Sequence, residues 1–286
     1  MVRRVPKVLF VVLFFSLAIP GLGQRPAPAS SGFTILLTND DGYDAPGLKA
    51  LIEAFRSVGD LYVVAPAENQ SGKGHSIATS EPILVSERKQ PNGVSWYAVE
   101  APPATCARLA IESLLPKHPD VVISGINRGE NLGIVVYYSG TLGAAREAAI
   151  VGIPAIAVSI DGNNAADYAA AADYTRQLVE QLRAQQRLEP GLFLNVNVPA
   201  GERKGVRITR LSVKATGEFF ERRVNPRGRT YFWSDWKPLG DDEEGTDVWA
   251  FVRGYITVTP MVLDVTETKG LDVLRPLETR ASAALR

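Results

Sequence analysis

The amino-acid sequence predicts an α/β fold in which helices cover a mostly parallel sheet, followed by a β-rich extension. Over residues 33–200, short apolar runs alternate with segments whose apolar residues recur at helical spacing. The runs are apolar at successive positions, as expected for strands that are buried on both faces of a sheet. After about residue 200 this alternation stops, and extended segments without strong helical patterns follow.

The first elements of the core lie on either side of an acidic turn. Residues 33–38 form a short apolar run, which predicts a buried strand. We expect Asp44 to cap the following helix, Pro46 to lie in its first turn, and apolar residues at helical spacing to continue as far as Val58. The other elements expected in the core are strands at 61–65, 94–99, 121–124, 155–160 and 192–198 and helices at 103–114, 141–150 and 165–185.

Residues 201–286 are expected to form the β-rich extension. Its predicted extended segments are residues 206–214, 230–236 and 248–259. Nine Lys or Arg residues fall between Arg203 and Arg229, and an acidic run follows at 241–244. These charges indicate either a solvated surface or a basic rim that attracts phosphorylated substrates. We expect the extension to form hairpins that pack on a partner subunit.

The N-terminus has the order of a secretory signal peptide. Basic residues within 1–7 precede an apolar stretch, and small residues follow up to position 23. The apolar stretch is shorter than the roughly 20 residues that span a membrane, so we expect cleavage of residues 1–23 and no stable membrane anchor. Residues 24–32 are expected to be a flexible lead-in. The predicted location is exported, periplasmic or secreted; the alternatives are an uncleaved anchor, or a cytoplasmic protein if the segment is not functional.

Composition argues against several kinds of partner and site. The formal net charge of the 286-residue chain is zero, which argues against binding a nucleic-acid polymer through overall charge. Cys106 is the only cysteine, so no intrachain disulfide can form. His75 and His118 are the only histidines and lie far apart in sequence, which argues against a zinc site of the usual His/Cys kind.

Polar side chains follow three of the expected strands. Asn39, Asp40 and Asp41 follow the first strand, Ser71 lies in the loop after the second, and Asn127 follows a later one. Open parallel sheets bind ligands beyond the carboxyl ends of their strands, so these side chains are expected to converge at one edge. Their oxygen atoms suit a hard cation such as Mg²⁺, Mn²⁺ or Ca²⁺. A cation would also relieve the repulsion between the two carboxylates, which otherwise raises the pKa of one of them.

The acidic pair also has a purely structural interpretation. Residues 39–42 suit a strand-to-helix turn with a cap, because Asp and Asn favour such turns, and this alternative stays open on sequence alone. An EF-hand loop is excluded, because Leu37 and Leu48 stand where such a loop needs ligands. A haloacid-dehalogenase-type phosphatase resembles this chain in having an acidic pair after its first strand, but there one residue separates the two acids.

A second polar group stands directly before an expected helix and consists of Ser139, Gly140 and Thr141. Hydroxyls and free backbone N–H groups at a helix start bind phosphate well, and Asn131 could add an amide donor. Ordinary N-capping by Ser139 or Thr141 is the alternative. A metal site and an anion site on one sheet edge together indicate hydrolysis of a phosphate ester.

Several ordered motifs resemble the SurE family, the survival-protein nucleotidases. Within residues 33–268 they are I-L-L-T-N-D-D-G-Y-D-A-P-G (35–47), V-V-A-P-A-E-N-Q-S-G (63–72), H-S-I (75–77), V-V-I-S-G-I-N-R-G-E-N-L-G (121–133), Y-S-G-T (138–141), N-V-N-V-P (195–199), G-T-D (245–247) and G-Y-I-T-V-T-P (254–260). The resemblance implies a Rossmann-like three-layer sandwich at 33–200 and a C-terminal arm at 201–286 used in dimer or tetramer assembly. It also implies one divalent cation per subunit and hydrolysis of nucleoside 5′- or 3′-monophosphates, in some members with short polyphosphate as well.

The resemblance also assigns roles to individual residues. The implied metal ligands are Asp40, Asp41, Ser71 and Asn127, of which Asp40 and Asp41 are also catalytic, and the implied phosphate pocket consists of Asn39, Asn131, Ser139, Gly140 and Thr141. The chain departs from many bacterial members at Thr105, Ile134 and Val135, where those members carry acidic residues. These departures leave the implied metal ligands untouched and bear on substrate preference and on the entry into a helix.

The chain thus has two competing functional interpretations. The first is a metal-dependent nucleotidase, and the second is an exported protein that binds phosphate or nucleotide without catalysis; the adjacent aspartates favour the enzyme. A dinucleotide-dependent oxidoreductase lacks support, because no Gly-x-Gly-x-x-Gly follows the first strand. His75 is either a general acid for the leaving group or a polar neighbour of the loop that carries Ser71.

Overall fold

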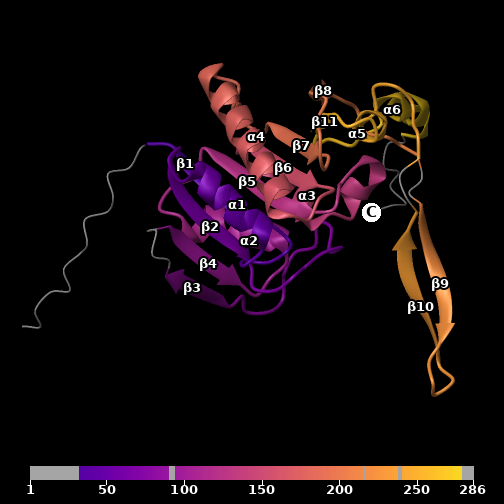
Figure 1. Ribbon diagram of the computed structural model, residues 1–286. Coiled ribbons are helices and arrows are strands. Elements are labelled where there is room, and N and C mark those ends of the chain that lie inside the picture. Colours follow the sequence, from indigo (N-terminus) through magenta and orange to yellow (C-terminus); the bar gives the residue numbers. More distant parts are fainter. Residues whose placement is uncertain (1–31, 90–93, 215–216, 238–239, 279–286) are drawn as a thin grey trace, which may run out of the picture. The chain divides into compact units, whose positions relative to one another are not determined.

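The computed structural model describes residues 32–89, 94–214, 217–237 and 240–278 of the chain (Figure 1). The expected signal peptide at 1–23 lies outside these residues, as does the lead-in at 24–32 except for Gly32. Within the described part of the chain, no helix is long and apolar enough to cross a membrane. Export of the protein stays a prediction.

In the described residues, a nine-stranded sheet has the order β3-β4-β2-β1-β5-β6-β7-β11-β8 (Figure 1). Its strands are β1 (Thr34–Thr38), β2 (Asp60–Pro66), β3 (Val85–Lys89), β4 (Ser95–Val99), β5 (Val121–Arg128), β6 (Ala155–Ile160), β7 (Phe193–Val198), β8 (Val206–Ile208) and β11 (Ile256–Pro260). From β4 to β7 all neighbours in this order are parallel, whereas β3 and β11 pair antiparallel with β4 and β7. The chain runs outward from β1 to β4 and then returns to β5 on the other side of β1. The ends of β1 and β5 therefore flank the switch point at which α/β sheets bind ligands.

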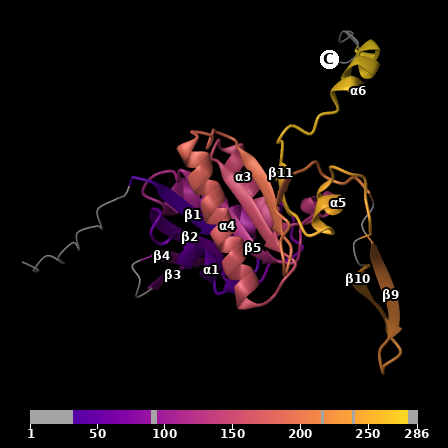
Figure 2. The ribbon, with the colours of Figure 1, turned by 45° about the horizontal axis from the view of Figure 1, so that its top comes forward.

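Helices cover both faces of the sheet, which confirms the predicted α/β fold with helices on a mostly parallel sheet. The helices are α1 (Pro46–Phe55) and α4 (Ala165–Ala184) on one face and α2 (Pro103–Leu109) and α3 (Gly140–Ile150) on the other. Figure 2 shows α4 crossing the near face of the sheet. Neighbouring residues of β1 divide between the two cores, since Leu37 faces α1 and α4 while Leu36 faces α2 and α3. Because α3 buries mostly alanine and glycine, its backbone approaches the sheet closely.

Two details of the helices differ from the expectation. Ala45 occupies the N-cap of α1 and offers no side-chain bond, whereas Asp44 forms an ion pair with Lys49 in which Oδ1 and Nζ are 2.7 Å apart. The predicted Asp44 cap is therefore wrong, and Pro46 in the first turn is confirmed. The helix expected at 103–114 is present, but beyond Leu109 it widens into a π-helical turn at Ala110–Leu114.

The chain after residue 200 contributes strands both to the main sheet and to a separate hairpin. The hairpin consists of β9 (Glu218–Val224) and β10 (Thr230–Trp236), and two further helices are α5 (Asp247–Phe251) and α6 (Thr268–Leu274). The extended segment at 230–236 is confirmed, but that at 206–214 shrinks to the three residues of β8. The continuous extended segment at 248–259 is wrong, because Thr246 caps α5 by accepting the Trp249 N–H at its Oγ1, 3.2 Å away.

Every residue of β9 and β10 is exposed (Figure 1). The two strands present an unusual number of large apolar side chains to solvent, namely Phe219, Phe220, Tyr231, Phe232, Trp233 and Trp236. An exposed apolar surface of this kind is typical of a surface that contacts another protein. Assembly through the extension stays a prediction.

Candidate active site

Asp40 stands at the point where the end of β1 meets the start of α3. Its side chain is only 3 % exposed, and its Oδ1 accepts a hydrogen bond of 2.5 Å from the Thr141 hydroxyl. Gly140 packs against the same carboxylate, since a Cβ on Gly140 would lie 2.8 Å from the Asp40 Cβ. The first turn of α3 therefore holds the Asp40 carboxylate through Oδ1. The second oxygen, Oδ2, stays available to bind a cation.

Burial makes the ionised form of Asp40 costly. It raises the pKa of Asp40 to about 6; the hydrogen bond from Thr141 opposes this rise, and the negative charge of Asp41 adds to it. Burial also raises the pKa of Asp41, against the hydrogen bond that the carboxylate accepts from Arg128. Two adjacent carboxylates that are both ionised near neutral pH thus lower their free energy by binding a cation.

The loop after β2 is placed beside the second carboxylate. Asp41 accepts the backbone N–H of Arg128 at Oδ2 (3.2 Å) and the side-chain amide of Asn69 at Oδ1 (3.4 Å). Asn69 in turn accepts the backbone N–H of Ser71 at 2.9 Å. A short chain of hydrogen bonds therefore positions Ser71 next to the acidic pair.

Asn127 lies within β5 rather than in a loop after it. The pairing of β5 with β6 shifts register between Ser124 and Asn127, which marks a bulge that redirects the strand end. The bulge depends on close backbone contact, because a Cβ on Gly125 would lie 2.4 Å from the Val158 carbonyl oxygen. The Asn127 amide nitrogen donates to the Gly129 carbonyl at 2.8 Å, which leaves the amide oxygen as the atom that can accept a ligand.

These residues fit a divalent cation. Asp40, Asp41, Ser71 and Asn127 offer two carboxylates, a hydroxyl and an amide oxygen, which suit a hard ion. Among the residues that the structure describes, no group of three or more His, Cys, Asp or Glu side chains could hold a metal. A site at this edge must therefore combine the acidic pair with neutral oxygen ligands.

Asn39 forms the strand-to-helix turn that was the structural interpretation of residues 39–42. Its amide nitrogen donates to the Gly42 carbonyl at 2.9 Å, and its amide oxygen accepts the Gly42 N–H at 3.2 Å. Since Asn39 closes the turn with its own side chain, Asp40 and Asp41 are not needed for it. The turn and the cation site are compatible, and the place of Asn39 in a phosphate pocket stays a prediction.

The residues predicted for the phosphate pocket fall into two groups. Ser139 is the N-cap of α3 and accepts the Leu142 N–H at 3.2 Å, which confirms capping by Ser139, whereas Thr141 donates to Asp40 and does not cap. Gly140 and Thr141 form the first turn of α3, where backbone N–H groups have no partner within the helix. Asn131 lies over the ends of β6 and β7, where its amide nitrogen donates to the Ser159 hydroxyl at 2.8 Å.

Four residues contribute to this edge although they were not among the predicted site residues. Arg128 and Asn69 bond to Asp41, and the positive charge of Arg128 lowers the pKa of that carboxyl. Asn195 and Asn197 donate to the Asn131 carbonyl at 2.8 and 3.2 Å. The spacing of two asparagines at i and i+2 in an otherwise apolar strand was a usable signal for this buried polar face.

Replacing Gly140 by alanine is expected to lower the free energy of unfolding by about 1–3 kcal/mol, because the new Cβ would press on the Asp40 Cβ. Over most of this range the crowding outweighs the roughly 1 kcal/mol by which alanine is ordinarily preferred over glycine in a helix. Urea unfolding of the metal-free protein measures the effect. Gly240→Ala is the matched control, since a Cβ on Gly240 meets no atom within 4 Å. Equal stability of both variants would contradict the tight packing of Gly140 on Asp40.

The chain is similar to known proteins over most of its length. The family model of survival protein SurE matches residues 35–218. The 5′-nucleotidase SurE of Heliobacterium modesticaldum is 47% identical over 238 residues, which are 81% of this chain and 87% of that protein. The 5′-nucleotidase SurE of Pelotomaculum thermopropionicum is 42% identical over 247 residues, which are 85% of this chain and 94% of that protein.

A solved structure agrees with both relatives. The crystal structure of the SurE protein from Aquifex aeolicus superimposes with a TM-score of 0.75 at 39% sequence identity, covering 86% of this chain and all of that one. The matched residues include the acidic turn after β1, the bulged end of β5 and the start of α3. This chain therefore belongs to the SurE family.

Proposed function

We propose that this chain is a divalent-metal-dependent phosphomonoesterase that hydrolyses nucleoside 5′-monophosphates to nucleoside and phosphate. One observation carries the proposal: the buried Asp40 carboxylate, beside Asp41, is held by the first turn of α3. The acidic pair and the N-terminus of a helix thus lie against each other, which suits a cation and a phosphate group bound between them. Relatives described as 5′-nucleotidase SurE support the nucleotide as substrate.

In this proposal, different residues bind the cation, position its ligands and bind the phosphate. Asp40, Asp41, Ser71 and Asn127 hold the cation, and the hydroxyl of Thr141 fixes the position of Asp40. The first-turn N–H groups of α3 bind oxygens of the phosphate that face away from the carboxylates. When bound, the cation polarises a phosphoryl oxygen and lowers the pKa of a bound water.

Several finer properties belong to the same proposal. The cation is Mg²⁺, Mn²⁺ or Ca²⁺, and nucleoside 3′-monophosphates and short polyphosphate are further substrates. The protein is exported, so that it acts on external nucleotides, and assembles as a homodimer or homotetramer through residues 201–286. The exposed aromatic side chains of β9 and β10 support this assembly.

Phosphate release from a panel of substrates tests the proposal. The panel contains 5′- and 3′-monophosphates of each nucleoside and tripolyphosphate, each assayed with Mg²⁺, Mn²⁺, Ca²⁺ or excess EDTA. We expect release from the 5′-monophosphates with at least one cation, loss of release in EDTA, and recovery when the cation is restored. Full activity in EDTA would contradict the metal site. Saturable nucleotide binding without phosphate release at any metal concentration would instead identify a non-catalytic binding protein.

A further inference from the structure

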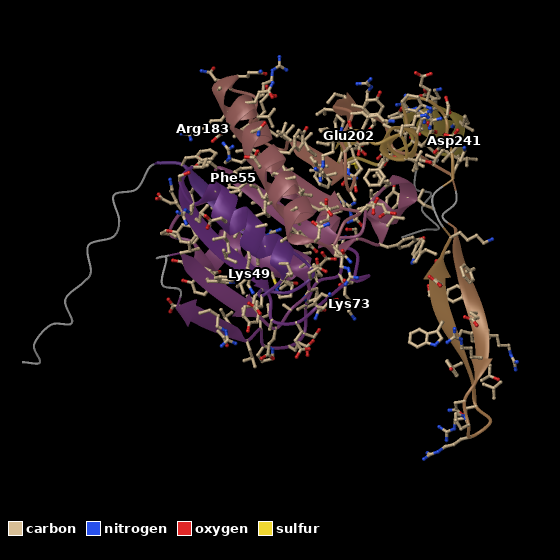
Figure 3. The ribbon with its side chains drawn as sticks, in the orientation of Figure 1. Lys49, Phe55, Lys73, Arg183, Glu202 and Asp241 are labelled. Carbon is tan, nitrogen blue, oxygen red and sulfur yellow. The ribbon has the colours of Figure 1, made fainter. Side chains whose placement is uncertain are left out.

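The loop that carries Ser71 has no secondary structure of its own. Ser71, Gly72 and Lys73 are exposed, and Lys73 is labelled in Figure 3. On the side of β1, the Gln70 N–H donates to the Asp40 carbonyl at 2.7 Å. This bond and the Asp41–Asn69–Ser71 hydrogen bonds hold only the near side of the loop, so its other side also has to be fixed if the Ser71 hydroxyl is to keep its position.

The other side of the loop packs directly on α3. The Gly74 N–H donates to the Tyr138 carbonyl at 2.9 Å, just before the helix begins. A Cβ on Gly143 would lie 2.4 Å from the Gly74 carbonyl oxygen, so loop and helix backbones touch with no side chain between them. These contacts fix the height of the loop over the helix. Both contacts lie at Gly74, near the start of the helix, and neither holds the loop farther along it.

A hydrogen bond between two side chains adds a contact farther along the helix. His75 Nε2 lies 2.7 Å from Glu147 Oε2, and Glu147 is one helical turn beyond Gly143 on the same face of α3. Glu147 is only 8 % exposed, and its Oε1 accepts a bond of 2.5 Å from Arg108 of α2. The hydrogen bond from His75 and, to a smaller extent, that from Arg108 lower the pKa of Glu147, so the carboxylate stays ionised. A third bond, from the Ala78 N–H to the Thr105 hydroxyl at 2.8 Å, ties the loop to α2 as well.

The helix α3 therefore positions two parts of the site. Its first turn holds Asp40 through Thr141, and its second and third turns hold the loop that carries Ser71. Only three residues lie between Ser71 and His75, so movement of one is passed to the other through a short stretch of backbone. The bond to Glu147 also occupies His75 Nε2, which does not favour this histidine as the general acid considered from the sequence.

We propose that the His75–Glu147 pair is a positioning device for the metal site, which holds the Ser71 hydroxyl in place beside Asp41 for coordination of the cation. His75 acts through Ser71 and touches neither substrate nor cation. The inference rests on the metal site of the proposed function. Its test uses metal binding rather than turnover, so a chain that binds the ion but hydrolyses no nucleotide would refute the proposed function alone.

The test is the affinity of the full-length protein for Mn²⁺, measured by titration calorimetry at ion concentrations up to the millimolar range. His75→Ala is expected to weaken Mn²⁺ binding by about tenfold, the scale at which outer groups that orient ligands act. His75→Gln, whose amide can still donate to Glu147, is expected to restore most of the affinity. Glu180→Gln is the matched control, because Glu180 is also ion-paired on a helix, with Arg176 at 2.7 Å, and faces solvent on α4. It should bind Mn²⁺ as the unmodified chain does.

A double-mutant cycle separates positioning from a general loss of stability. If His75 acts through Ser71, then His75→Ala should cause no further loss of Mn²⁺ affinity in a Ser71→Ala background. Thermal unfolding of each variant checks that it is folded. The proposal is overturned if His75→Ala binds Mn²⁺ within twofold of the unmodified chain, if Ser71→Ala leaves binding unchanged, or if the two losses add.

Discussion

Asp40→Asn is expected to lower phosphate release by at least about 100-fold while raising the stability of the metal-free protein above pH 6. The loss of activity follows from the proposed role of this carboxylate as a metal ligand, since even removing groups that only orient ligands costs 10- to 100-fold. The gain in stability follows because burial holds the pKa of Asp40 at about 6 instead of its ordinary 3.8. The ionised carboxylate therefore costs about 3 kcal/mol at pH values above both.

The direction of the pH dependence follows from the same shift. The native state binds the Asp40 proton more tightly than the unfolded chain does, so the free energy of unfolding falls as pH rises from about 4 to about 6. Urea unfolding in EDTA at several pH values should show this fall in the unmodified chain and a smaller fall in Asp40→Asn. A divalent cation should stabilise the unmodified chain by mass action and the variant much less.

A matched control tests whether the effect depends on the buried position of the carboxylate. Asp44→Asn makes the same chemical change four residues later, at an exposed side chain paired with Lys49. It is expected to alter neither phosphate release nor the pH dependence of stability. An Asp40→Asn protein with full activity would refute the metal site, and one less stable than the unmodified chain at pH 8 would refute the cost of the buried charge.

Asp247→Ala is expected to lower the free energy of unfolding by at least about 3 kcal/mol. Asp247 is fully buried and accepts backbone N–H groups of Gly133 (2.8 Å), Ser212 (2.8 Å) and Val248 (2.9 Å). Each buried donor left without an acceptor costs about 1–3 kcal/mol. Gly133 also opens a 3₁₀ turn, η2 (Gly133–Tyr137), that leads into the N-cap of α3, so phosphate release should fall as well.

Asp264→Ala provides the comparison for this effect. Asp264 also accepts a backbone N–H, that of Thr266 at 2.9 Å, but its side chain is exposed and water can replace it. Its removal is expected to change the free energy of unfolding far less than removal of Asp247, because surface substitutions of this kind have small effects. Thermal and urea unfolding of both variants measure the difference. Similar small losses in the two variants would show that Asp247 does not hold these segments together.

The elements of the parallel core could be predicted because their patterns are strong. β6 coincides with the apolar run at 155–160, and α3 and α4 differ from their predicted ranges by one residue at one end. β3 and β9 were missed because they are rich in charged residues, with the sequences V-S-E-R-K and E-F-F-E-R-R-V, and so lack the apolar run of a buried strand. α5 was taken for an extended segment because Val248, Trp249 and Phe251 favour strands, while the cap at Thr246 decides for a helix.

The site could be predicted only in part, because a strand end indicates which residues meet but not what they bond to. The sequence placed Asp40 and Thr141 at one edge, but only the fold reveals that one donates to the other. The Asp44 cap failed because the lysine one turn later in α1 attracts that carboxylate. The His75–Glu147 pair had no signal in the sequence, since its members are 72 residues apart and belong to different predicted elements.

The long spans of chain that close this site have a consequence for protein synthesis. The Asp40–Thr141 bond joins residues 101 positions apart, and the bond from Gly133 to Asp247 joins residues 114 positions apart. A nascent chain that has reached residue 240 already contains the acidic pair and α3, but it lacks the carboxylate that holds Gly133. Asp247 thus completes the support of a residue translated more than a hundred codons earlier. We expect premature termination before residue 247 to yield a protein that contains the predicted site residues but lacks the carboxylate that holds Gly133.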